Sequence, residues 1–214
     1  VAREKLEKIK ALGVETILYS NDSGIAEQHA QKLAKEQGKI YVSPYNDPQI
    51  IAGQGTLAIE LLDQLPRLDV VYVSIGGGGL ISGIGSVLKA FSPKTKVVGV
   101  SARNSAELAA SIRAGKMVKV DHQETLADGC AGGVDSDTIT LGLGSEVIDD
   151  LIDCSEGQIE SGLQQIAWSE KMLVEGSAGL AYAAWQEDAR NNKNKTSAVV
   201  LCGANFDKET LSPI

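Results

Sequence analysis

The sequence Val70-Val71-Tyr72-Val73-Ser74-Ile75-Gly76-Gly77-Gly78-Gly79-Leu80 decides the fold. Residues 70–75 form an apolar run of the kind found in strands that are buried on both faces. Four glycines follow, and a helical pattern then continues to a point near Ala90. The segment therefore predicts a buried strand, a glycine turn and a helix, which together make one βα unit.

The same pattern recurs along the rest of the chain. Strand-like apolar runs lie at Val97–Val100, Leu151–Cys154 and Ala198–Leu201. Strands that alternate with helices favour a mostly parallel sheet with helices on both faces. The sequence thus predicts an α/β fold with three αβα layers. The helical patterns that separate the runs cover residues 104–114, 137–149, 156–173 and 177–190.

The N-terminal part has shorter elements. One helical pattern ends at Gly13, and a second covers Ser23–Glu36. Short runs rich in apolar residues follow each of them, at Val14–Tyr19 and Ile40–Val42, and predict strands. Residues 43–48 contain two prolines and several turn formers, which predict a loop. We expect a domain boundary at this loop.

Composition and charge exclude several classes of function. The 214 residues are 43% hydrophobic, which is enough to bury a core. A formal net charge of −8 disfavours binding to nucleic acid or to an anionic membrane, because both surfaces are negative. No stretch approaches the roughly 20 apolar residues that a membrane span requires. We therefore expect neither nucleic acid nor membrane among the partners.

The cysteines indicate a compartment. Cys130, Cys154 and Cys202 lie far apart and lack the spacing of a metal site. Their odd number does not make a disulfide framework, so the sequence favours the reducing cytoplasm.

The glycine turn predicts a site for an anion. Ordering four consecutive glycines is costly, because glycine loses more backbone freedom on folding than any other residue. A turn without Cβ atoms can bring several N–H groups toward one anion, and the helix that follows adds partial positive charge. Close packing of strand against helix is the structural alternative. Neither the phosphate-loop motif of nucleotide-binding proteins nor the dinucleotide fingerprint is present.

Five motifs in order give the chain a resemblance to a known family. It resembles the fold-type-II pyridoxal-phosphate (PLP) enzymes of the serine/threonine dehydratase type, which include threonine ammonia-lyase, serine racemase and ectoine-utilisation dehydratase-like members. The resemblance implies an incomplete fold of the tryptophan-synthase-β type, with residues 1–45 left from the small domain and residues 46–214 forming the large PLP-binding domain. The motifs are Ile51-Ala52-Gly53-Gln54-Gly55-Thr56, Gly76-Gly77-Gly78-Gly79-Leu80, Thr125-Leu126-Ala127-Asp128-Gly129, Val174-Glu175-Gly176-Ser177-Ala178-Gly179 and Leu201-Cys202-Gly203-Ala204-Asn205.

The resemblance also implies roles for individual residues. Backbone N–H groups of Gly76, Gly77, Gly78 and Gly79 would bind the PLP phosphate, and Cys202 would face the pyridine nitrogen. Glu175 would lie near the cofactor ring, although it could instead cap a helix. Asp128 and Gly129 would lie beside cofactor and substrate, although Asp128 could instead form an Asx turn. We interpret Cys130 and Cys154 as packing residues.

Two departures from the family pattern stand out. The Ser-Phe-Lys type motif with the Schiff-base lysine is absent from this sequence, and lysines such as Lys5, Lys8, Lys10, Lys32 and Lys35 fall on polar helix faces, as solvated charges do. The positions at which some relatives hold a divalent metal read Ser101, Ser105 and Glu107, with one carboxylate lost. We therefore expect no well-occupied metal site.

The histidines and tryptophans suggest no chemistry. His29 and His122 stand alone, without a carboxylate or cysteine signature, and we expect them to be exposed. Trp168 and Trp185 occur among apolar residues at helical spacing, which predicts aromatics of the core or of an interface.

The function implied for the intact protein is PLP-dependent β-elimination, which dehydrates and deaminates a small hydroxy amino acid such as L-threonine or L-serine. This chain alone should be inactive without the lysine. Two alternatives stay open: an amino-acid racemase of the same family, and a non-catalytic fragment that binds PLP or another anion. The resemblance further implies a homo-oligomer, most simply a dimer.

Overall fold

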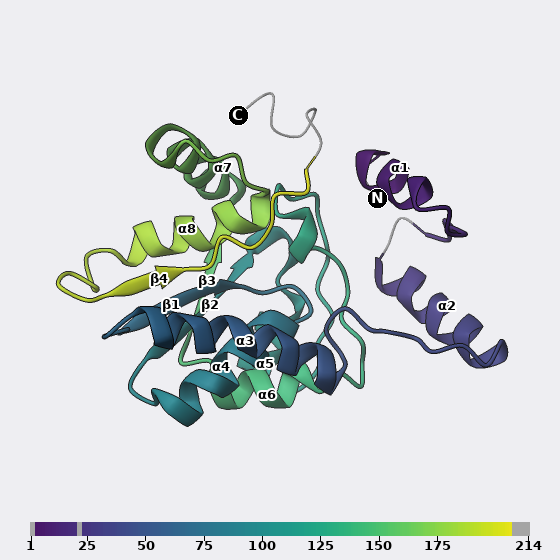
Figure 1. Cartoon of the computed structure of the whole chain (residues 1–214), viewed down its shortest axis with the longest axis horizontal. Coiled ribbons are helices and arrows are strands. Elements are labelled where there is room, and N and C mark those ends of the chain that lie inside the picture. The colour runs from purple at the N-terminus through teal and green to yellow at the C-terminus, as the bar shows by residue number, and fades with distance from the viewer. Residues whose placement is uncertain (1–2, 21–22, 207–214) are drawn as a thin grey trace.

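The sheet confirms the predicted α/β class. A computed structural model describes residues 3–20 and 23–206, and within these residues four parallel strands form one sheet in the order β3-β2-β1-β4 (Figure 1). Strand β1, Val70–Ser74, lies between two neighbours and all five of its residues are buried. The other strands are β2, Lys96–Ala102; β3, Asp150–Cys154; and β4, Ser197–Val199.

Helices cover both faces of the sheet, as the alternating pattern predicts (Figure 1). One layer contains α3, Pro48–Gln64; α4, Gly79–Phe91; α5, Glu107–Ala114; and α6, Thr140–Val147. The opposite layer contains α7, Glu156–Gln165, and α8, Gly176–Asp188. The fold is thus an αβα sandwich. Strand β1, which precedes the glycine turn, has a neighbouring strand on each side in the central sheet.

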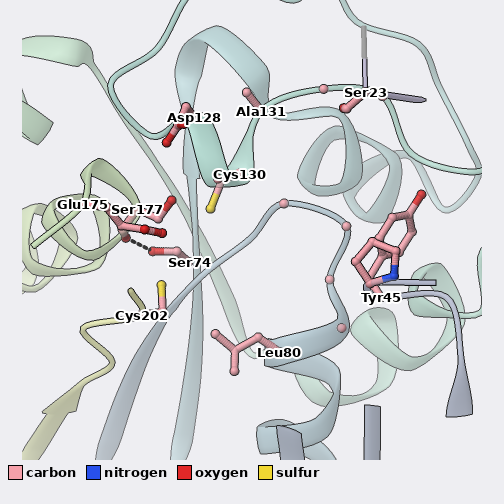
Figure 2. Close-up of a pocket in the computed structure, with 18 of the residues that line it drawn as sticks. Ser23, Tyr45, Ser74, Leu80, Asp128, Cys130, Ala131, Glu175, Ser177 and Cys202 are labelled. Carbon is pink, nitrogen blue, oxygen red and sulfur yellow. Dashed lines mark hydrogen bonds between the residues drawn. The ribbon is translucent and has the colours of Figure 1, made fainter. Parts of the chain in front are cut away.

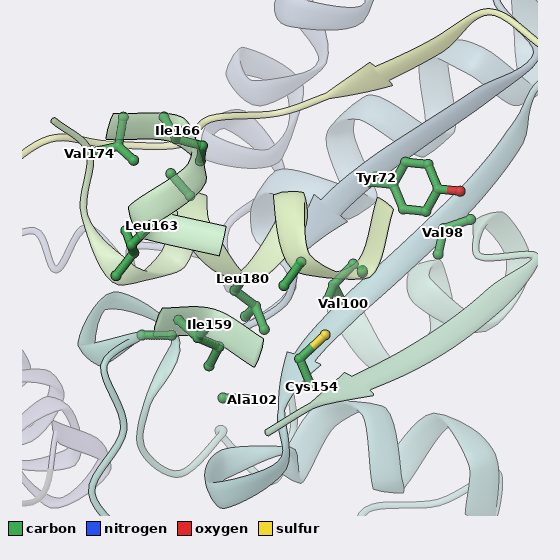
Figure 3. Packing of buried hydrophobic residues seen from close by; sticks show 14 of the residues in the cluster. Tyr72, Val98, Val100, Ala102, Cys154, Ile159, Leu163, Ile166, Val174 and Leu180 are labelled. Carbon is green, nitrogen blue, oxygen red and sulfur yellow. The ribbon is translucent and has the colours of Figure 1, made fainter. Parts of the chain in front are cut away.

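Two apolar cores hold these layers together, one on each face of the sheet. The core beneath α7 and α8 joins Ile159 and Leu180 of these helices to Val98 and Val100 of β2 (Figure 3). Cys154 is fully buried in the same core, which confirms its interpretation as a packing residue. Because β1 and β2 contribute side chains to both cores, their sequences are almost continuously apolar.

The predicted strands at Val14–Tyr19 and Ile40–Val42 are wrong. Helices α1, Arg3–Ala11, and α2, Ser23–Glu36, lie where the helical patterns placed them, but the two short runs between and after them form no strand. Their apolar side chains, including Ile40, are largely exposed. A strand needs a partner for its hydrogen bonds, and no other strand of the described chain pairs with these runs. The domain boundary at residue 45 stays a prediction.

Several predicted elements are shorter in the structure because tight turns replace their ends. The pattern at 104–114 begins with the 3₁₀ turn Arg103–Ser105 before α5, and the pattern at 156–173 divides into α7 and the π-helical turn Ile166–Glu170. The patterns at 137–149 and 177–190 correspond to the helices α6 and α8 described above.

Glycine allows α3 and α4 to approach each other closely. A Cβ atom added at Gly83 would collide with the carbonyl oxygen of Ile51 and lie 2.7 Å from the backbone nitrogen of Gly55. Backbone atoms cannot move aside as the end of a flexible side chain can. The contact therefore fixes the helix that follows the glycine turn.

We predict that Gly83→Ala lowers the free energy of unfolding by about 2 kcal/mol, because overpacking of a tight helix contact has a cost of this order. Urea unfolding followed by circular dichroism measures the change. Gly142→Ala is the matched control, since Gly142 lies in α6 with no heavy atom within 4 Å of an added Cβ. The control should be neutral or stabilising. Equal destabilisation by both substitutions would contradict this interpretation of the α3–α4 contact.

Candidate active site

A cavity of about 410 Å³ lies at the carboxyl end of β1, next to the glycine turn (Figure 2). This is the edge of an open α/β sheet at which ligands usually bind. The structure brings together all the site residues predicted from the sequence, although they come from four separate segments. The residues that line the cavity include Gly76, Gly77, Gly78, Gly79, Asp128, Gly129, Glu175 and Cys202.

The glycine turn leaves no space for side chains. Gly78 is the N-cap of α4 and has a φ of 85°, in the left-handed region that favours glycine. A Cβ atom at Gly76 would lie 2.9 Å from the Cα atom of Cys130, and one at Gly79 would lie 2.9 Å from the Cα atom of Tyr45. The first N–H groups of a helix have no partner within the helix. The turn thus offers backbone donors and the positive end of α4 to the cavity.

Tyr45 braces this turn from the outside. An added Cβ atom at Gly77 would collide with the Tyr45 ring, so the ring covers the turn directly. The Tyr45 hydroxyl accepts a hydrogen bond from the backbone N–H of Asp135 at 2.9 Å, and burial raises the pKa of this hydroxyl. Thr140 Oγ1 donates to the carbonyl oxygen of Gly77 at 2.7 Å. The sequence indicates only a loop at residues 43–48 and gives no signal for the role of Tyr45.

Glu175 directs its carboxylate away from the helix that it precedes. It is the N-cap of α8, yet its side chain makes no capping hydrogen bond, so the capping alternative is wrong. Its Oε2 atom accepts instead from the N–H of Asn205 at 3.1 Å. Gly203 has a φ of 103°, and an added Cβ there would collide with the Glu175 carboxyl group. Glycine at position 203 therefore lets the carboxylate lie at the cavity wall.

Two thiols line the cavity. Burial raises the pKa of Cys202, and it raises the pKa of Cys130 to about 12, so both thiols are neutral near pH 7. Figure 2 shows them on either side of Ser74, whose hydroxyl donates to the carbonyl oxygen of Ser177 at 2.6 Å. Cys130 packs against the core beneath α7 and α8, as interpreted from the sequence, and it also lines the cavity. Its position directly after the Asp128-Gly129 motif was the signal available in the sequence.

Asp128 connects the cavity to the N-terminal helix α1. It begins the 3₁₀ turn Asp128–Cys130, and its Oδ2 atom lies 2.9 Å from Nζ of Lys5. The Lys5 side chain is only 21% exposed, so the expectation that it is a solvated charge is wrong. Among the described residues that line the cavity there is neither lysine nor arginine.

At two of the three positions where some relatives hold a divalent metal, Ser105 and Glu107, the side chains make hydrogen bonds within the protein. Both oxygens of the Glu107 carboxylate accept hydrogen bonds, one from His122 and one from the backbone N–H of Val134. The expectation that His122 stands without a carboxylate is therefore wrong. Nowhere in residues 3–20 and 23–206 do three or more His, Cys, Asp or Glu side chains form a group that could hold a metal ion. Over the same residues, no helix has the length and apolar character needed to cross a membrane.

Comparison with known proteins identifies the family. Residues 1–203 match the family described as "Pyridoxal-phosphate dependent enzyme". The chain belongs to this family. Among its curated relatives, the L-threonine ammonia-lyase of Thermotoga maritima is 34% identical over 98% of the chain and 52% of the relative. The catabolic L-threonine dehydratase of Escherichia coli is 32% identical over 94% of the chain and 61% of the relative.

Solved structures support the same fold. The processed form of threonine deaminase isoform 2 from Solanum lycopersicum has a TM-score of 0.89 and 29% identity, over 99% of this chain and 62% of that one. Maize serine racemase has a TM-score of 0.88 and 27% identity, over 99% of this chain and 65% of that one. The fold-type-II architecture is thus confirmed. The chain spans about half the length of the first curated relative that it matches.

The residues around the cavity fit the cofactor of the family. A phosphate is an anion that needs several converging donors, and the glycine turn presents backbone N–H groups where side chains are excluded. A neutral thiol at Cys202 suits a pyridine nitrogen that is not forced to carry a proton. The donor set therefore agrees with PLP.

We predict that Gly78→Ala weakens the binding of PLP and of inorganic phosphate by roughly tenfold or more, because the added Cβ disfavours the positive φ and collides with Leu108 beneath the turn. Titration calorimetry measures both affinities. Gly115→Ala is the matched control, since Gly115 also has a positive φ but ends α5 with no heavy atom within 4 Å of an added Cβ. It should lose stability and keep affinity. Unchanged affinity in Gly78→Ala would refute the phosphate role of the turn.

Proposed function

We propose that this chain forms the PLP-binding part of an ammonia-lyase that acts on L-threonine or L-serine. The reaction is a β-elimination, in which the substrate loses its Cα proton and its β-hydroxyl group and finally releases ammonia. One observation carries the proposal: the glycine turn, the Asp128-Gly129 turn, Glu175 and Cys202 converge on a single cavity. The relatives named as threonine ammonia-lyase and threonine dehydratase support the choice of reaction.

The cavity walls suggest a division of roles. Gly76–Gly79 would hold the cofactor phosphate, and Cys202 would face the pyridine nitrogen as a neutral thiol. PLP, when bound, supplies an electron sink for the carbanion at the substrate Cα atom. Glu175 would stand beside the ring. Asp128 and Gly129, at the rim, would border the substrate.

The amine that removes the Cα proton is not supplied by the described cavity lining. Lys5 is the lysine held at the rim, and its Nζ atom is bound to Asp128. This ion pair holds the amine at Asp128, and Lys5 is not among the described residues that line the cavity. We therefore propose that the chain alone has no dehydratase activity, and that the complete enzyme draws its catalytic lysine from residues outside this sequence.

We predict that the purified chain, mixed with PLP and passed through a gel-filtration column, carries no covalent PLP–lysine adduct after borohydride reduction. Mass spectrometry of peptides measures the adduct, and an assay for ammonia with L-threonine and L-serine measures the activity. A single modified lysine together with ammonia release would overturn the proposal. If that lysine were Lys5, the Lys5→Ala variant should lose both signals.

Two other functions can be distinguished from the ammonia-lyase by the products that the complete enzyme forms. Maize serine racemase is as similar in fold as the threonine deaminase, which favours a racemase as the second candidate. Conversion of L-serine to D-serine by the complete enzyme, at a rate above that of ammonia release, would establish it. A non-catalytic PLP- or anion-binding module is the third candidate, and it predicts binding without either product in every form of the protein.

We also propose that residues 1–45 and 46–214 belong to different domains of a cytoplasmic protein. Helices α1 and α2 lie outside the three layers (Figure 1), which supports a boundary near residue 45. All three cysteines of the sequence lie in the described residues and are free thiols, as expected in a reducing compartment.

Self-association is proposed from one exposed apolar patch. Trp168, Met172 and Leu173 lie in and after the π-helical turn, and they line a largely apolar cavity with Leu163 beneath them. Trp168 is 74% exposed, so it is no core residue. Exposed apolar clusters of large side chains usually mark interaction surfaces, and twofold homodimers are the commonest assembly. We propose that a second copy of the chain covers this patch.

We predict that the chain sediments as a dimer and that Trp168→Ser sediments as a monomer, because the substitution removes the largest apolar side chain of the patch. Phe91→Ser is the matched control, since Phe91 is 76% exposed at the end of α4 and lies outside the patch. The control should remain dimeric. A monomeric wild type, or a Trp168→Ser variant that is still dimeric, would contradict the assignment.

A further inference from the structure

A line of hydrogen bonds beside the cavity joins the start of α5 and the 3₁₀ turn before it to the loops that contain His122 and Gly132. The N–H of Gly132 donates to Ser105 Oγ at 3.0 Å, and Ser105 Oγ lies 2.8 Å from Nδ1 of His122. Nε2 of His122 lies 3.0 Å from Oε2 of Glu107, whose Oε1 atom accepts from the N–H of Val134 at 3.0 Å. Ser105 and Glu107 are 4% and 6% exposed. The imidazole, whose side chain is 26% exposed, thus bonds two buried side chains.

The hydrogen-bonding capacity of Glu107 sets the direction of one bond in this line. A carboxylate only accepts, so the Nε2 atom of His122 must carry a hydrogen and donate it to Glu107. Ser105 Oγ accepts from the N–H of Gly132 and shares a second hydrogen bond with Nδ1 of His122. The imidazole therefore gives both Glu107 and Ser105 a hydrogen-bonding partner. Removal of the imidazole would leave two buried side chains short of a partner.

Of the two backbone groups held by this line, that of Gly132 belongs to a residue that lines the cavity, and Val134 directly follows the lining residues. Ala131, Gly132 and Gly133 line it, and Gly132 has a φ of 112°, which side chains rarely tolerate. This wall touches the glycine turn, since an added Cβ at Gly76 would lie 2.9 Å from the Cα atom of Cys130. A shift of the wall would therefore change the space beside the phosphate donors.

We infer that His122 is a positioning residue for the PLP cavity: through Ser105 and Glu107 it holds residues 130–134 against the glycine turn. The inference rests on the proposed function in that PLP is the ligand of the cavity. The same bonds engage both oxygens of Glu107, so this wall is held by an imidazole and not by a divalent cation.

The test compares His122→Phe with wild type in the full chain without ligand. Phenylalanine keeps a flat ring and loses both hydrogen bonds. Residue-resolved hydrogen exchange by NMR should show roughly tenfold faster exchange at the amides of Gly132 and Val134, the factor that corresponds to one or two lost hydrogen bonds. His29→Phe is the matched control: His29 stacks on Tyr19 with ring centroids 3.7 Å apart, and a phenyl ring can keep that stack.

Affinity for PLP provides the functional readout. His122→Phe should bind PLP roughly tenfold more weakly than wild type and His29→Phe. The reason is that displacement of the wall should cost about as much binding free energy as the loss of one hydrogen bond. Glu107→Gln is the conservative variant, because its amide can still accept from Val134 and donate to the other tautomer of His122. It should approach wild type in both readouts, whereas Glu107→Leu should not. Millimolar Mg²⁺ or Ca²⁺ should leave the exchange of wild type unchanged.

Each outcome decides the inference. Unchanged exchange at Gly132 and Val134 in His122→Phe overturns it, and so does faster exchange with unchanged PLP affinity. Slower exchange of wild type on addition of a divalent cation also overturns it. If His122→Phe fails to fold, Ser105→Ala replaces it, and this variant should accelerate Gly132 alone. A wild type that binds no PLP refutes the proposed function, while the exchange data still decide whether His122 holds the wall.

Discussion

The absence of Cβ atoms between Gly76 and Gly79 is the constraint on which the site depends. It lets the Tyr45 ring approach the turn from one side and the loop around Cys130 approach it from the other. The Tyr45 ring and the turn are themselves held in place, because the Tyr45 hydroxyl binds the backbone of Asp135 and Thr140 binds the carbonyl of Gly77. Any side chain in the turn would separate these segments. The cavity therefore exists because four residues contribute only backbone.

Backbone dipoles must also supply the positive potential of the site. The chain carries a formal net charge of −8, and the carboxyl groups of Asp128 and Glu175 line the cavity without a lysine or arginine among its described lining residues. Two helices, α4 and α8, begin at the cavity, and each presents the positive end of its dipole there. The ion pair of Asp128 with Lys5 offsets part of the negative charge at the rim. An anion is thus held by geometry more than by formal charge.

The sequence allowed the layers, the parallel sheet and the eight cavity residues to be predicted, because strand periodicity and an ordered set of motifs are local signals. Tyr45 and His122 could not be assigned in the same way. The role of Tyr45 depends on a contact with residues more than thirty positions away. His122 looked isolated because its partners Ser105 and Glu107 meet it only after α5 turns the chain back. Hydrogen-bond partners that are distant in sequence leave no periodic pattern.

The strands predicted at Val14–Tyr19 and Ile40–Val42 do not form, because a strand also depends on a partner that is distant in sequence. Their residues favour strands, but a strand is a property of a pair of segments, since its stability comes from hydrogen bonds to a neighbour and from packing across the pair. Helix formation requires only local bonds, so α1 and α2 form on either side of Val14–Tyr19. Within this N-terminal part, Lys5 reaches the cavity rim at Asp128 and Gln31 reaches Asp135 of the loop that Tyr45 binds. The N-terminal part is therefore tied by polar contacts to the walls of the site, and its conformation and that of the cavity depend on each other.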